Sequence, residues 1–85
     1  MADVAVIVKV MPEGSEVDLD RVAKEVEARV DVHKIEKEPI AFGLEALIVI
    51  AVVPDAAGGT DELEETLAGI DGVGNVYVTG LTRLL

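Results

Sequence analysis

The sequence contains no cysteine, no tryptophan and only two aromatic residues, Phe42 and Tyr77. Without cysteine the chain can form no disulfide framework, no thiolate metal site and no cysteine nucleophile. Basic residues are also scarce, since 7 lysines and arginines stand against 17 aspartates and glutamates and the net charge is −10. Nucleic acids and anionic membranes are bound by clustered basic side chains, so we expect neither as a direct partner. The acidity instead favours a basic partner surface.

Hydrophobic residues make up 51% of the chain, and with so few aromatics the core must be built from valine, isoleucine, leucine and alanine. A chain this apolar folds rather than forming a disordered acidic tail, and its length suits a single domain over residues 1–85. The longest uncharged apolar stretch, Ala46–Val53, is too short to cross a bilayer. No basic region precedes the first apolar run, so we expect no export signal and a cytoplasmic location.

The spacing of apolar residues predicts six elements. Runs of β-branched residues predict strands, and apolar residues three and four positions apart predict helices. Asp18 is a suitable N-cap for the first helix, Asp61 and Glu64 form a capping pair for the second, and Asp55–Gly59 is expected to be a loop. In chain order the elements are strand Val4–Met11, helix Leu19–Val30, strand Val32–Glu38, strand Leu44–Val53, a helix with its apolar stripe at Leu63, Leu67 and Ile70, and strand Asn75–Leu85.

This order predicts an α+β fold of the ferredoxin-like βαββαβ type. Such a sandwich has a four-stranded antiparallel sheet with both helices on one face, and it accommodates two right-handed crossovers and one hairpin in a short chain. The continuously apolar strand Leu44–Val53 is expected in the middle of the sheet. The charged strand Val32–Glu38 is expected at its edge.

Side chains alternate between the two faces of a strand, so one set should meet the helices and the other should lie on the open face of the sheet. Ile48 and Ile50, flanked by Ile7, are candidates for an apolar patch on that open face. Either neighbouring side chains partly cover the patch, or it is an interaction or self-association surface. In the third strand the alternation places one group on one face and the other group on the opposite face: Leu47, Val49, Ala51 and Val53, and Ile48, Ile50 and Val52. In the last strand it places Val76 and Val78 on one face and Tyr77, Thr79, Leu81 and Arg83 on the other.

Residues that carry enzyme chemistry are few. His33 is the one histidine, and no second histidine or cysteine exists to share a metal with it. The clustered acidic residues fall at the expected helix starts, where they complement the helix dipole. The glycine-rich entry to the second helix has no lysine to hold a phosphate. We therefore expect no metal, no cofactor and no catalytic residues.

Two features bear on whether the chain binds a protein partner. Phe42, the one phenylalanine, lies in a turn between Pro39 and Gly43. It is either an outward interface anchor, since aromatics that fill partner pockets dominate binding energy, or a side chain that folds back over one end of the sandwich. Arg83 is the one basic residue from Glu38 onward, among eight acidic residues. It either pairs with a neighbouring carboxylate, which contributes little at a surface, or acts on a partner.

The residues around these two features resemble a known family. The run EPIAFGLEALIVIAVVPDAAGGTDELEE (Glu38–Glu65) and the ending VGNVYVTGLTRLL are similar to the guanine-nucleotide exchange domain of translation elongation factor 1-beta, in its short archaeal form. The resemblance covers the last 48 residues well, and the first 37 fit by their element pattern. The family has a ferredoxin-like fold, in agreement with the fold that the periodicity predicts.

The resemblance implies an exchange factor that promotes GDP release from the GTPase elongation factor 1-alpha, so that GTP can bind during translation elongation. It implies no bond-making chemistry, and therefore no enzyme. In the family, an aromatic residue in the turn before the third strand enters an apolar pocket of the GTPase, and Phe42, between Pro39 and Gly43, occupies that position. A basic residue next to the C-terminus reaches toward the Mg²⁺ site, and Arg83 matches it. Two departures are the arginine, where eukaryotic members carry lysine, and the two leucines that follow it.

A second hypothesis for the same fold is a regulatory or oligomerisation module that binds a small ligand. Such a module would dimerise through its edge strands or through the face that carries Ile48 and Ile50. It would have no effect on a GTPase, which separates it from an exchange factor.

Overall fold

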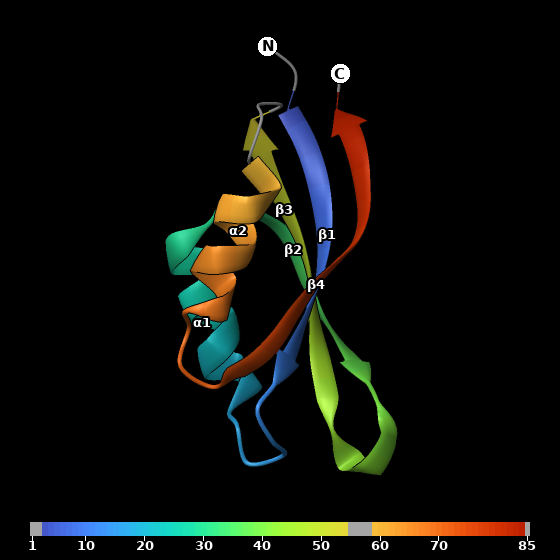
Figure 1. Ribbon diagram of the computed structural model, residues 1–85. Coiled ribbons are helices and arrows are strands. Elements are labelled where there is room, and N and C mark those ends of the chain that lie inside the picture. Colours follow the sequence, from blue (N-terminus) through green and yellow to red (C-terminus); the bar gives the residue numbers. More distant parts are fainter. Residues whose placement is uncertain (1–2, 55–58, 85) are drawn as a thin grey trace.

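The computed structural model describes residues 3–54 and 59–84 of the chain (Figure 1). Neither of the two α-helices in this part of the chain is long and apolar enough to cross a membrane. A three-residue 3-10 helix, η1, connects the second and third strands. The elements are β1 (Asp3–Pro12), α1 (Leu19–Arg29), β2 (Val32–Pro39), η1 (Ala41–Gly43), β3 (Glu45–Pro54), α2 (Gly59–Ala68) and β4 (Val73–Leu84).

The four strands form one antiparallel sheet in the order β2-β3-β1-β4, and both helices pack on the same face of it (Figure 1). This arrangement confirms the ferredoxin-like α+β fold. It also confirms the apolar strand β3 as a central strand and the charged strand β2 as an edge. The strand ends differ from the expected ones by one or two residues, and β4 begins at Val73 rather than at Asn75.

The core lies between the sheet and the two helices. The core residues recur every second position along β1 and β3 and at helical spacing along α1 and α2, as the periodicity predicts, and Ala46 of β3 is also buried although it does not belong to this core cluster. Burying one such valine or leucine side chain contributes about 1.5–3 kcal/mol, so these rows supply most of the stabilisation. The core includes Val4, Val6, Val8 and Val10 from β1, Val22 and Val26 from α1, Leu47, Val49 and Ala51 from β3, and Leu63 and Leu67 from α2.

The two helices begin differently. Asp18 caps α1 as predicted, because its carboxylate accepts hydrogen bonds from the backbone N–H groups of Asp20 (3.0 Å) and Arg21 (3.3 Å). The predicted start of α2 was wrong, since the helix begins at Gly59 and Asp61 therefore lies inside its first turn. There the charge of Asp61 complements the helix dipole. The remainder of the expected loop, residues 55–58, lies outside the described residues.

Strand β4 contains two bulges. Gly74 and Thr79 have no partner on β1, because the register passes from Val73 to Asn75 and again from Val78 to Gly80. Each extra residue increases the local twist of the strand, and β4 is strongly twisted in Figure 1. The second bulge also corrects the predicted alternation. Leu81 pairs with Val6, a core residue, and so shares the face of Val78 rather than that of Tyr77.

Candidate functional site

The turn that carries Phe42 is the tip of the β2–β3 hairpin, which projects beyond the helix layer at one end of the molecule (Figure 1). Its backbone is closed by two hydrogen bonds. The N–H of Ile40 donates to the carbonyl oxygen of Leu44 (2.7 Å), and the N–H of Leu44 donates to that of Ala41 (3.2 Å). Phe42 is the central residue of the enclosed 3-10 helix. The hairpin therefore presents Phe42 on a short, internally bonded turn.

Pro39 and Gly43 stiffen this turn in different ways. Pro39 is the last residue of β2, pairs with Glu45, and has its φ restricted by its ring. Gly43 has φ +75°, which side-chain-bearing residues rarely adopt, although a Cβ atom there would meet nothing within 4 Å. Gly43 is thus required by its conformation and not by lack of space. Both residues are exposed, as a partner-binding turn requires.

Strand β2 is tied to the start of α1 close to the hairpin turn. The ammonium group of Lys37 on β2 lies 2.8 Å from the carboxylate of Asp20 on α1. This hydrogen bond, together with the attraction between the charges, holds the pKa of Asp20 below its ordinary value and raises the pKa of Lys37. A cavity of about 170 Å³ opens beside the pair, and its lining includes Pro12, Ser15, Asp18, Asp20, Lys37 and Gly43.

Asp20→Asn is expected to lower the free energy of unfolding at about pH 7 and to have a smaller effect at about pH 2.5. A pKa that is lower in the folded state stabilises the protein above the unfolded pKa of about 4, and this contribution is lost as the pH falls through the folded value. The raised pKa of Lys37 sets the upper end of the pH range in which the ion pair stabilises the fold. The stabilisation by Lys37 is lost as the pH rises through its folded pKa, which lies above the ordinary value of about 10.4.

Urea unfolding at the two pH values measures this effect. A double-mutant cycle with Lys37→Gln separates the ion pair from the interaction of Asp20 with the helix dipole. Because both groups are exposed, the coupling should shrink in about 1 M salt. Zero coupling at neutral pH and low salt would contradict the prediction.

Arg83 lies at the other end of the sheet. Its partner on β1 is Val4, which also pairs with Val53 of β3. From Val53 to Glu45, where the hairpin turn begins, is eight residues along β3, or about 26 Å. The structure therefore does not bring Phe42 and Arg83 together, and no single small group can contact both. The side chains of Phe42 and Arg83 fall outside the described part of the structure, which places both residues by their backbone alone.

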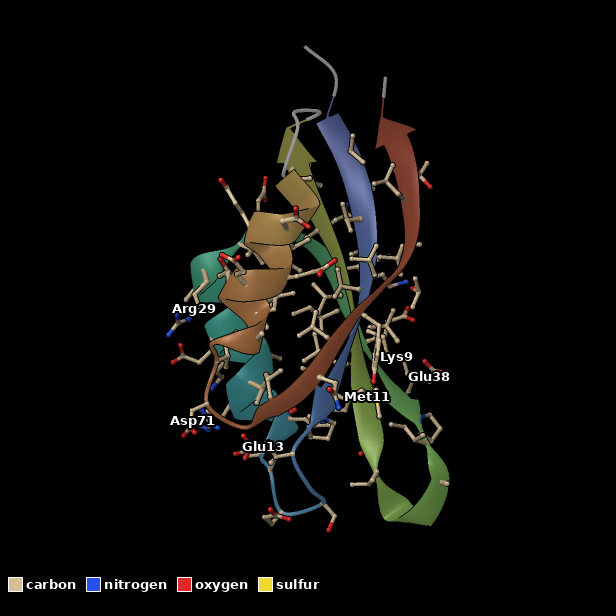
Figure 2. The ribbon with its side chains drawn as sticks, viewed as in Figure 1. Lys9, Met11, Glu13, Arg29, Glu38 and Asp71 are labelled. Carbon is tan, nitrogen blue, oxygen red and sulfur yellow. The ribbon has the colours of Figure 1, made fainter. Side chains whose placement is uncertain are left out.

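The sheet face away from the helices is apolar in the centre and charged toward β2. Ile7, Ile48 and Ile50 are half-buried there, and Tyr77 beside them is 52% exposed. Lys9 pairs with Glu38 across this face at 3.9 Å, as Figure 2 shows, and a second ion pair joins Lys34 to Glu36 on β2 at 2.7 Å. The face on which Ile48 and Ile50 lie is thus as predicted.

The bulge at Thr79 is the feature of the site region that the sequence prediction missed. Its signal was Gly80, because a glycine inside a strand pattern often marks a bulge or a close approach of another chain segment. A Cβ atom on Gly80 would lie 3.2 Å from Cδ1 of Ile7, so Ile7 occupies that space. Among the described residues, no three histidine, aspartate or glutamate side chains gather in a way that would hold a metal ion.

Comparison with known proteins identifies the family. The model of the EF-1 guanine nucleotide exchange domain matches residues 5–84. Elongation factor 1-beta of Methanothermobacter thermautotrophicus is 52% identical over 89 aligned positions, which cover 100% of both chains. Elongation factor 1-beta of Metallosphaera sedula is 48% identical and covers 99% of this chain and 98% of its own length, and that of Methanosphaera stadtmanae is 47% identical with full coverage of both. The chain therefore belongs to the EF-1 guanine nucleotide exchange domain family, with archaeal elongation factor 1-beta proteins among its relatives.

Proposed function

We propose that this chain promotes the exchange of GDP for GTP on elongation factor 1-alpha during translation elongation. The match to the exchange-domain family over residues 5–84 carries this proposal. The stiff, exposed turn between Pro39 and Gly43 supports it, because an interface anchor must be held in place before the partner arrives. The cytoplasm, where translation takes place, is the location that follows.

The proposed mechanism is thermodynamic linkage. The factor and the Mg²⁺–GDP complex bind the GTPase with negative coupling, so each lowers the affinity of the other by the same factor. The chain makes and breaks no covalent bond, and excess GTP in the cell sets the direction of exchange. In this scheme the turn with Phe42 binds an apolar pocket of the GTPase, and Arg83 acts near the Mg²⁺ and nucleotide.

The separation of about 26 Å along β3 constrains how the GTPase is bound. Because Phe42 and Arg83 lie at opposite ends of the sheet, the GTPase must extend along most of the longest dimension of the chain, which is 41 Å. The net charge of −10 would speed this encounter with a basic GTPase surface and make its rate fall with salt.

Stopped-flow release of a fluorescent GDP analogue from elongation factor 1-alpha tests the proposal. Unlabelled GTP is kept in excess, and the concentration of this chain is varied. The observed release rate is expected to rise and then saturate, which yields a maximal rate and a half-saturating concentration. A release rate that stays at the spontaneous value at every concentration would overturn the proposed function.

A further inference from the structure

We propose that Thr79 is a positioning residue, whose bulge in β4 places Arg83 on the face and at the height of the sheet where it acts on the GTPase. This inference rests on the proposed function and deepens it. The bulge is seen in the backbone pairing of β4 with β1. It leaves Thr79 without a partner, while Val78 pairs with Val8 and Gly80 pairs with Ile7.

The bulge reverses the alternation of every residue that follows it. Val8 is a core residue and Ile7 lies on the open face, so the pairing puts Gly80 on the open face and Leu81 on the face of the core. Arg83 is two positions beyond Leu81 and pairs with Val4, which is also a core residue. Arg83 is thus placed at a register position on the face of the sheet that carries the core, in the edge strand β4, where Leu81 on the same face is 54% exposed.

A strand without the bulge would place Arg83 differently. If Thr79 paired with Ile7, every later residue would move one position along β1, and Arg83 would lie opposite Asp3 instead of Val4. Because strand positions alternate between faces, that shift also transfers Arg83 to the open face. One unpaired residue therefore decides on which face of the sheet Arg83 lies.

Two features of β4 hold the bulge at this position. The hydroxyl group of Thr79 donates a hydrogen bond to the carbonyl oxygen of Ile7 (3.3 Å), which is the strand residue opposite the bulge. The absence of a side chain at Gly80 leaves room for Ile7, because a Cβ atom there would lie 3.2 Å from Cδ1 of Ile7 and 3.7 Å from its Cβ. The donor at position 79 and the glycine at position 80 both favour the bulged pairing.

Two changes that shift the pairing of Arg83 with β1 by one residue in opposite directions test the inference. Thr79→Val with Gly80→Val removes the hydrogen bond and the space for Ile7, and it supplies β-branched residues that favour the unbulged pairing. Deletion of Thr82 keeps the bulge but moves Arg83 opposite Ala5. Each change alone transfers Arg83 to the open face. Combined, they return Arg83 to its position opposite Val4.

The maximal rate of GDP release is expected to fall about tenfold or more in each single variant and to recover in the combined one, because misplacement by one residue exceeds the tolerance of a positioned group. The half-saturating concentration should change little, since the hairpin is unaltered. Backbone NOEs between the β1 residues and Arg83 report the register independently of activity. They should show Val4 opposite Arg83 in the unaltered and combined chains only.

The outcomes separate this inference from the proposed function. If the unaltered chain accelerates release and the deletion of Thr82 retains that acceleration, the inference is wrong and the proposed function stands. If the NOEs show the expected registers but the combined variant fails to recover, the position of Arg83 does not explain the loss and the inference is again wrong. If the unaltered chain does not accelerate release, both are overturned.

Discussion

Phe42→Ala is expected to raise the half-saturating concentration for accelerated GDP release about 30-fold, with a much smaller change in the maximal rate. Truncating an aromatic anchor in a partner pocket typically costs about 2 kcal/mol or more, which corresponds to this factor in affinity. The turn itself should persist, because its two closing hydrogen bonds are made by the backbone of Ile40, Ala41 and Leu44. The loss therefore belongs to the complex and not to the fold.

Tyr77→Ala is the matched control. Tyr77 is the other aromatic residue in the chain, it is 52% exposed, and it lies on the open sheet face rather than at the hairpin tip. Its half-saturating concentration should stay near that of the unaltered chain. Isothermal titration of elongation factor 1-alpha with both variants measures affinity directly. Equal affinities of Phe42→Ala and the unaltered chain would show that Phe42 is not the anchor.

Arg83→Ala is expected to act on the other kinetic parameter and to lower the maximal rate of release about 30-fold. If Arg83 acts near the Mg²⁺ and nucleotide within the complex, it contributes where water is excluded, and removing such a charge costs about 2 kcal/mol or more. Arg83→Lys retains the charge and should keep part of the acceleration. It should not keep all of it, because an ammonium group is a point donor and a guanidinium group is a planar fork.

Arg29→Ala controls for the change in net charge, because Arg29 is an exposed arginine of α1 that pairs with Glu25 of the same helix at 3.3 Å. Both variants carry a net charge of −11, one less than the −10 of the unaltered chain, so any general electrostatic effect on encounter is shared. Figure 2 places Arg29 on the helix side of the molecule. If the two alanine variants release GDP at the same maximal rate, the role of Arg83 is refuted.

Phe42 and Arg83 lie far enough apart for the effects of changing them to be independent. Sites more than about 10 Å apart with no shared partners usually contribute additively, and Phe42 and Arg83 are separated by more than twice that distance along β3. The double variant should therefore combine a 30-fold loss of affinity with a 30-fold loss of maximal rate. Strong departure from additivity would show that the GTPase couples the two contacts through a change of its own conformation.

Much of this molecule follows from local patterns. The alternation of valines in β1 and the three-and-four spacing around Val22 and Val26 predict buried faces, because strand and helix periods act over a few residues. The same is true of the cap at Asp18 and of the turn between Pro39 and Gly43, since φ preferences and capping are properties of neighbouring residues. These patterns suffice for the element order, and in so short a chain the order suffices for the fold.

The features that the sequence predicted wrongly are mainly those that depend on pairing between strands distant in the sequence. Local alternation put Leu81 and Arg83 on the face of Tyr77, and the bulge at Thr79 reverses this. The hydrogen bond that holds the bulge joins residues 72 positions apart, so no window along the chain contains both partners. The start of α2 at Gly59 was a smaller error, of the kind expected where glycine is permitted both inside and before a helix.

The sequence by itself therefore determined the elements, the buried rows, and the identity of the two scarce residues, an aromatic in a stiff turn and an isolated base. Only the tertiary structure decided that they stand at opposite ends of one sheet, that Lys37 ties β2 near the hairpin turn to Asp20, and that Arg83 lies opposite Val4. The physical reason is the distance along the chain over which each kind of interaction acts. Backbone preferences and periodicity act between neighbours, whereas register, bulges and cross-element ion pairs arise from contacts between segments that only folding brings together.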